Sequence, residues 1–248
     1  MAERVSKGRE SRLINSLMVD FDGVILRKEE ERPGGEGLLS NILRLVSDKS
    51  GVAGESAKAE RKRLLKKYKT SQSAIAMQKE FGMSALGFAE RVYVPEISNM
   101  SRHTFGADIE FLDMLRGFDM PKVILTNSSE RFVSAALSAI GANGEFAEVV
   151  GMERLGLQMK PERGAYEKAI ALSGFTPEET VYFDDNREML RVPVEMGMVA
   201  VWITGKEATQ EQYRDNANEG IYPFSSFASA LKSIKREGRA YIFDMRKA

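Results

Sequence analysis

The sequence predicts an α/β fold, with a doubly wound parallel sheet whose helices lie between the strands and a helical domain inserted into it. Three observations support this. Short apolar segments end in turn or polar residues, segments with helical periodicity separate them, and a long helix-rich region follows the first apolar segment. Strands that alternate with helices of about a dozen residues are typical of parallel sheets.

Five segments have the composition of buried strands, because each is short, apolar and bounded by turn-forming or polar residues. They cover residues 17–21, 122–126, 146–151, 180–184 and 198–203. Beyond the last of them we expect a polar helix, a short strand and a terminal helix, at 207–218, 220–223 and 227–234. The end of the chain, 236–248, fits either an edge strand at 241–243 or a loose tail.

Two helices are indicated between the middle strands. Apolar residues recur at helical spacing from Ser129 to Ile140, and Gly141 stands where a C-cap belongs. Pro161 suits the first position of the next helix, which Gly174 can end.

The region between the first two strands is too long for an ordinary connection. It holds about eighty residues rich in helix formers, whereas a βα loop usually has only a few residues. We therefore expect an α/β core at 1–26 and 106–248 and a helical cap domain at 27–105. Residues 31–37 would form a flexible entry to the cap and residues 107–108 would lie near its exit.

Composition excludes several classes of site. Lys plus Arg and Asp plus Glu both count 36, so no overall field favours nucleic acid or an anionic membrane surface. Cysteine is absent and His103 is the single histidine, which excludes disulfides, thiolate sites and multi-histidine metal sites. Carboxylates remain as metal ligands, and these favour a hard cation such as Mg²⁺.

The sequence predicts neither a secretory signal nor a membrane-spanning segment. Residues 1–15 lack the apolar core of a secretory signal, and the longest uncharged apolar stretch, 196–205, is too short to span a bilayer. We expect a cytoplasmic protein.

Polar residues gather where the predicted strands end, which is where open parallel sheets bind their ligands. In chain order they are Asp20, Asp22, Thr126, Asn127, Lys160, Asp184 and Asp185. Four carboxylates in one pocket would repel one another unless cations were present. Mg²⁺ and the Lys160 ammonium could supply three positive charges.

These residues form four short motifs: Asp20-x-Asp22-Gly-Val, apolar-Thr126-Asn127, Lys160-Pro161 and Tyr-Phe-Asp184-Asp185. In order and chemistry they resemble the haloacid dehalogenase superfamily of phosphohydrolases, over about residues 16–204. The resemblance implies a Rossmann-like, doubly wound core. The helical insert resembles the C1-type cap, which closes over the active site.

The resemblance also implies a role for each residue. Asp20 would be the nucleophile that forms an aspartyl-phosphate, and Asp22 the acid and base. The Asp20 carboxylate, the Asp22 carbonyl and Asp184 or Asp185 would hold Mg²⁺. Three further groups would bind the phosphoryl oxygens, namely Thr126, Asn127 and Lys160.

Each motif also has a purely structural interpretation. Thr126 and Asn127 could cap the following helix, Lys160 could be a solvated loop residue, and residues 184–186 could form a helix N-cap and turn. The basic run at 58–69 could attract phosphorylated substrates or form a solvated helix face. His103 could contact substrate or act as a hinge residue.

The resulting prediction is a Mg²⁺-dependent phosphatase for a small soluble phosphate ester, such as a nucleoside monophosphate. Residues 68–75 and 125–131 resemble the pyrimidine 5'-nucleotidase-like branch. A phosphomutase and a non-catalytic phosphate-binding protein are the alternatives. Asp22 argues against dehalogenation, because a halide leaving group needs no proton. The expected partner is a small phosphorylated metabolite, and the oligomeric state is open.

Overall fold

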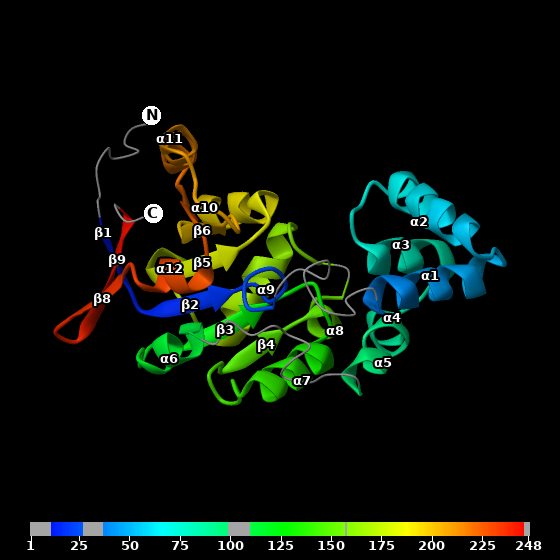
Figure 1. Cartoon of the computed structure of the whole chain (residues 1–248), viewed down its shortest axis with the longest axis horizontal. Coiled ribbons are helices and arrows are strands. Elements are labelled where there is room, and N and C mark those ends of the chain that lie inside the picture. Colours follow the sequence, from blue (N-terminus) through cyan, green and yellow to red (C-terminus); the bar gives the residue numbers. More distant parts are fainter. Residues whose placement is uncertain (1–10, 27–36, 99–109, 157, 246–248) are drawn as a thin grey trace.

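The computed structural model describes residues 11–26, 37–98, 110–156 and 158–245. Its centre is a parallel six-stranded sheet in the order β4-β3-β2-β5-β6-β7 (Figure 1). These strands are β2 (Ser16–Val19), β3 (Lys122–Leu125), β4 (Glu148–Val150), β5 (Thr180–Asp184), β6 (Val199–Ile203) and β7 (Ile221–Phe224). The α/β fold class is confirmed, and all five predicted core strands form, most of them a residue or two shorter than expected.

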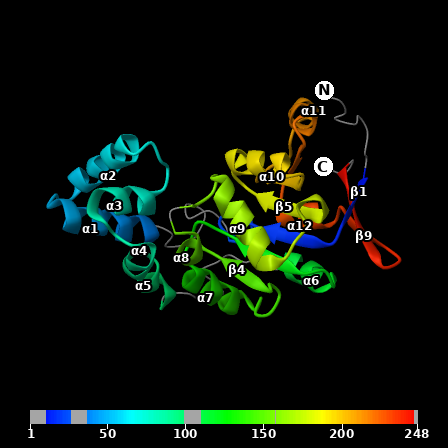
Figure 2. The same cartoon turned by 180° about the vertical axis from the view of Figure 1, so that it is seen from behind.

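Helices cover both faces of this sheet because alternate strand residues point in opposite directions. Leu17 and Val19 pack with residues of α6 (Glu110–Arg116), α7 (Glu130–Ile140) and α12 (Phe227–Leu231). Met18 faces α8 (Met152–Leu155), α9 (Arg163–Ser173) and α10 (Arg191–Glu195), and Figure 2 shows α9 over that face. The sheet is therefore doubly wound.

Strand order places a topological switch point between β2 and β5. The chain leaves β2 toward β3 and leaves β5 toward β6, so the two connections diverge. Val19 pairs with Phe183, and the Asp20 amide donates to the Phe183 carbonyl at 2.8 Å. Asp20 and Asp184 consequently stand level at the carboxyl edge of the sheet, in the crevice where such folds bind ligands.

Five helices of the described chain form a group, which lies at one end of the molecule (Figure 1). They are α1 (Gly37–Ser50), α2 (Glu55–Lys67), α3 (Ser73–Phe81), α4 (Ala85–Val92) and α5 (Val94–Ile97). Their buried cluster includes Leu45, Leu64 and Phe88, and it also takes in Met152 and Met159 from the sheet side. Both expected cap boundaries, and His103, lie outside the described residues.

The termini form a second sheet that the sequence did not fully predict. β1 (Ser11–Ile14) and β8 (Ile234–Glu237) both pair antiparallel with β9 (Ala240–Asp244). Of the two alternatives for the end of the chain, a strand does form at 241–243, but it is the central strand of this sheet and not an edge strand. The terminal helix expected to reach residue 234 stops at Leu231, because Ile234 begins β8.

Two other helices differ from expectation only in where they begin. α11 (Gln210–Asn218) starts after its N-cap Thr209, which forms a capping box with Gln212. The Pro161 prediction was wrong: Glu162 has extended backbone and is the N-cap, so α9 begins at Arg163. Pro161 instead follows a cis peptide bond with Lys160.

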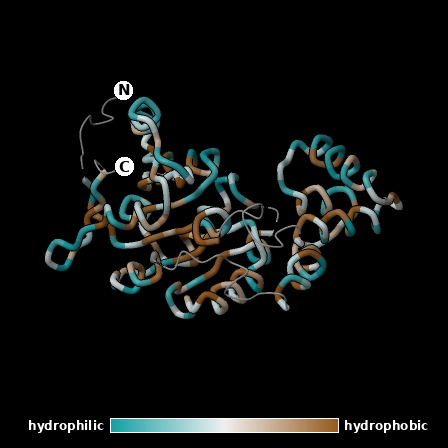
Figure 3. Tube along the Cα trace, in the orientation of Figure 1, coloured by the Kyte–Doolittle hydropathy of each residue, from teal (hydrophilic) through white to brown (hydrophobic). Residues whose placement is uncertain are grey.

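Hydropathy follows this architecture (Figure 3), with apolar residues on the central strands and hydrophilic residues on α2 and α11. Among the described residues, no helix has the length and apolar character needed to cross a membrane.

Candidate active site

Asp20 lies at the end of β2 and is only 7% exposed. Its Oδ1 accepts a hydrogen bond from the Phe21 amide at 2.7 Å and lies 2.9 Å from Lys160 Nζ. The chain then turns back at Gly23, whose φ of 80° favours glycine. Because both interactions act on Oδ1, they fix the carboxylate and leave Oδ2 as the oxygen available for chemistry.

Lys160 is buried among the ends of the strands, so the solvated-loop interpretation is wrong. Its Nζ lies 2.9 Å from Asp20, 2.8 Å from Asp184 Oδ2 and 2.9 Å from the Tyr182 hydroxyl. Tyr182 itself donates to Asp184 Oδ2 at 2.5 Å. An ammonium has three protons to donate, and these contacts can use all of them.

Charge in this cluster is unevenly balanced. Burial alone would lower the pKa of Lys160, but Asp184 and Asp20 outweigh it and hold that pKa above its usual range. Burial raises the pKa of Asp20 well above its usual range; Lys160 opposes this rise, whereas Asp184 and Asp22 add to it. A single ammonium therefore does not neutralise the carboxylates around it.

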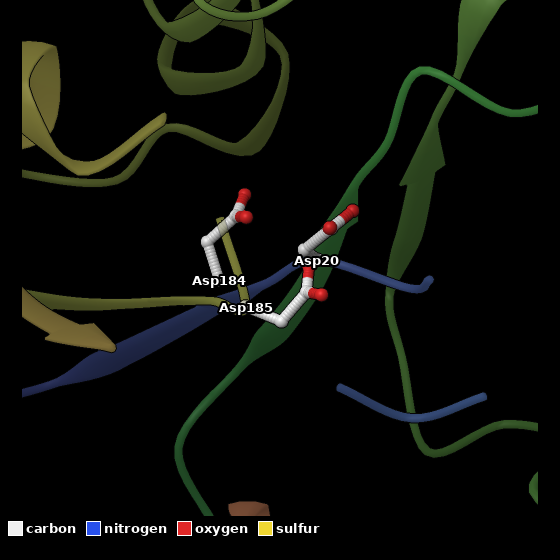
Figure 4. A group of neighbouring side chains, drawn as sticks. All are labelled: Asp20, Asp184 and Asp185. Carbon is white, nitrogen blue, oxygen red and sulfur yellow. The ribbon is translucent and has the colours of Figure 1, made fainter. Parts of the chain in front are cut away.

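Three carboxylates converge in a way that suits a divalent cation. Asp20, Asp184 and Asp185 each offer an oxygen, and these oxygens lie within 4.8 Å of one another (Figure 4). The Trp202 indole holds the Asp185 carbonyl at 3.0 Å. An all-oxygen donor set with excess negative charge fits Mg²⁺. The Asp184 to Asn186 segment also contains the expected turn, since Asp184 Oδ1 accepts from the Asn186 amide.

Gly23 permits the close approach of the Asp20 loop to this group. A Cβ on Gly23 would lie 2.3 Å from Asp185 Oδ2. Real side chains do not tolerate such a contact, so any residue other than glycine would push the Asp185 carboxylate aside.

The segment after β3 does not cap a helix through Thr126 or Asn127. Ser129 is the N-cap of α7, and Thr126 Oγ1 instead accepts from the Ser128 amide at 3.0 Å. The Asn127 side chain exchanges two hydrogen bonds of 2.9 Å with the backbone of Lys160. Asn127 thus ties the Lys160 segment to the carboxyl end of β3.

All seven residues predicted from the sequence line one cavity of about 420 Å³. It lies between the sheet edge and the helical group. The sequence did not identify several other lining residues: Gly23, Leu38, Ile42, Gln72, Tyr93, Ser128, Asn186 and Met189. The spacing of Leu38 and Ile42, one helical turn apart, was a usable signal, but nothing in the sequence showed which face of their helix meets the site.

The basic run at 58–69 lies largely on α2, and two of its cations, Arg63 and Lys67, form ion pairs with nearby glutamates. Glu80 lies 2.5 Å from Lys67 and 3.6 Å from Arg63, and Arg63 also pairs with Glu60. Within the described chain, the residues lining the cavity include none from α2. The solvated-face interpretation therefore accounts for this run.

Solved structures with a similar fold belong to proteins that are named for different activities. A HAD phosphatase from Thermococcus onnurineus has a TM-score of 0.59 and 21% identity, over 88% of this chain and 97% of that one. A β-phosphoglucomutase from Clostridium difficile has a TM-score of 0.56 and 15% identity, over 87% and 92%. An L-2-haloacid dehalogenase from Xanthobacter autotrophicus has 0.53 and 13%, over 88% and 97%.

Sequence identities this low show that these proteins share a fold with this chain, but they do not show that they share an activity with it. The sequence matches none of the curated proteins with which it was compared. The model of the haloacid dehalogenase-like hydrolase family, however, matches residues 14–188, which is more than half of the chain. This protein belongs to the haloacid dehalogenase-like hydrolase family.

Proposed function

We propose that this protein is a Mg²⁺-dependent phosphomonoesterase that acts through an aspartyl-phosphate on a small phosphate ester, such as a nucleoside monophosphate. The observation that carries the proposal is the buried Asp20, fixed at Oδ1 by Phe21 and Lys160 at the switch point of the sheet. Such a carboxylate is oriented for attack through its other oxygen.

In the first step, Asp20 Oδ2 would attack phosphorus, forming a new O–P bond as the bond to the leaving oxygen breaks. Asp22 would give its proton to that oxygen, so the alcohol departs neutral. In the second step, a water molecule attacks phosphorus, Asp22 takes its proton, and Asp20 is released with inorganic phosphate.

The surrounding residues would bind the transferring group. Lys160 supplies a buried positive charge beside Asp20, and the Thr126 hydroxyl and the Asn127 amide lie on the same cavity wall. Asp20, Asp184 and Asp185, with the Asp22 carbonyl, would hold Mg²⁺, which when bound stabilises charge on phosphoryl oxygens.

The helical group supports a small substrate. Leu38 and Ile42 from α1, Gln72 before α3 and Tyr93 after α4 line the cavity opposite the carboxylates. We propose that residues 27–105 form a cap whose wall contacts the leaving group. A cavity of about 420 Å³ accommodates a small ester and leaves no room for a folded phosphoprotein domain.

Phosphate release from p-nitrophenyl phosphate and from nucleoside monophosphates, with and without Mg²⁺, tests this proposal. Asp20→Asn should lower kcat by at least about a thousandfold, because the nucleophile is lost. Asp113→Asn is the matched control, since Asp113 has a side chain that is 88% exposed. Equal rates for Asp20→Asn and the unaltered protein would refute the assignment. Transfer of phosphate to a second sugar hydroxyl instead of water would indicate a mutase.

A further inference from the structure

We infer that Ser128 is a positioning residue that orients Asp22, and that Tyr93 links the helical group to it. The inference rests on the proposed function, in which Asp22 carries the proton. Ser128 Oγ donates a hydrogen bond to Asp22 Oδ2, and the Tyr93 hydroxyl lies 3.4 Å from the same Oγ. All three residues line the cavity.

The backbone of Ser128 is held in place, so its hydroxyl can fix the position of the Asp22 carboxylate. It is 5% exposed, its amide donates to Thr126 Oγ1 at 3.0 Å, and its carbonyl accepts from the Met152 amide at 3.0 Å. A Cβ on Gly151 would lie 2.7 Å from that carbonyl, so the close packing depends on this glycine. The backbone of Ser128 is thus fixed on both sides.

Asp22 needs such support more than Asp20 does. Asp20 is buried and held by Lys160, whereas Asp22 lies in the turn that follows and is half-buried. Proton transfer requires the carboxyl group to stay within hydrogen-bond reach of the leaving oxygen. The hydrogen bond from Ser128 to Oδ2 limits how far this carboxyl group can turn.

Tyr93 joins this arrangement from the helical side. It follows α4, and its ring packs on Phe132 of α7 with 5.3 Å between centroids and on Phe88 with 6.4 Å. These aromatic contacts place the Tyr93 hydroxyl beside Ser128. The position of the helical group therefore bears directly on the residue that orients Asp22.

The test compares two aromatic esters whose leaving groups differ in their need for a proton. Nitrophenolate from p-nitrophenyl phosphate leaves readily unprotonated, whereas the alkoxide of benzyl phosphate must be protonated. Ser128→Ala should lower kcat/KM for benzyl phosphate about ten- to hundredfold more than for p-nitrophenyl phosphate. Tyr93→Phe should change the same ratio in the same direction, by a smaller factor.

Two variants separate orientation from general damage. Ser128→Thr keeps a hydroxyl and should return the ratio toward that of the unaltered protein. Ser129→Ala removes the neighbouring hydroxyl, which caps α7 and donates to Glu153, so it should lower stability while leaving the ratio unchanged.

The outcomes distinguish this inference from the function on which it rests. If the unaltered protein releases phosphate but Ser128→Ala lowers kcat/KM for both esters by the same factor, Ser128 does not orient Asp22 and the inference is wrong. If the unaltered protein hydrolyses neither ester, or if Asp20→Asn is fully active, the proposed function itself fails.

Discussion

Replacing Lys160 with methionine should destabilise the fold strongly, because it removes the cation from a buried cluster. Asp184 is fully buried and Asp20 nearly so, and both lie within 2.9 Å of the ammonium. Methionine fills similar volume but leaves the two carboxylates facing each other without a cation. Breaking a buried pair in this way costs about 3–5 kcal/mol. Lys62→Met, at an exposed site on α2, should change stability by less than about 0.5 kcal/mol.

The loss should depend on pH in a definite direction. In the variant, burial still raises the folded-state pKa of Asp20 and the opposing effect of Lys160 is gone, so this pKa lies further above its unfolded value. The folded protein then binds more protons than the unfolded chain, and its stability falls as pH rises through this range. Urea unfolding should therefore show the full loss near about pH 8 and less than about half of it near about pH 5. A loss that is equal at both pH values, or below about 1 kcal/mol, would refute the reasoning.

Three further predictions concern neighbouring residues. Gly23→Ala should weaken Mg²⁺ activation about ten- to hundredfold by displacing Asp185, and an unchanged Mg²⁺ titration would contradict this. Leu38→Ala with Ile42→Ala should raise KM for aromatic esters about tenfold while sparing acetyl phosphate; equal effects on both would argue against a leaving-group wall. Tyr182→Phe should lower unfolding free energy by about 1–3 kcal/mol in urea, because Lys160 and Asp184 lose a shared partner.

The sequence was sufficient for the central sheet because its middle strands, β2, β3 and β5, are buried on both faces and are short, largely apolar runs. It was insufficient for the second sheet. β1 pairs Ser11 with Asp244, almost the whole chain away, and Leu13 is 61% exposed. In β8 the residues after Ile234 are charged and exposed. β1 and β8 form because they pair with β9, and no local sequence pattern predicts that pairing.

A similar limit applies to the site. The motif residues were found because parallel strands bring their carboxyl ends to one edge, whatever the length of chain between them. Tyr182 could have been noticed, since it lies two residues before Asp184 on the same face of β5. Tyr93 could not, because its contact with Ser128 depends on how the helical group packs against α7 and α8.

The two aspartates of the opening motif are only two residues apart, yet the fold gives them different surroundings. Asp20 ends a buried strand and is held by Lys160, which suits a group that must attack from one fixed position. Asp22 lies beyond it in the turn, where it is half-buried and accepts a hydrogen bond from Ser128. This position suits a group that must give a proton to the leaving oxygen and then take one from the attacking water. Gly23 makes this separation possible by reversing the chain against Asp185. The turn thus gives the two aspartates the different surroundings that the proposed division of roles requires.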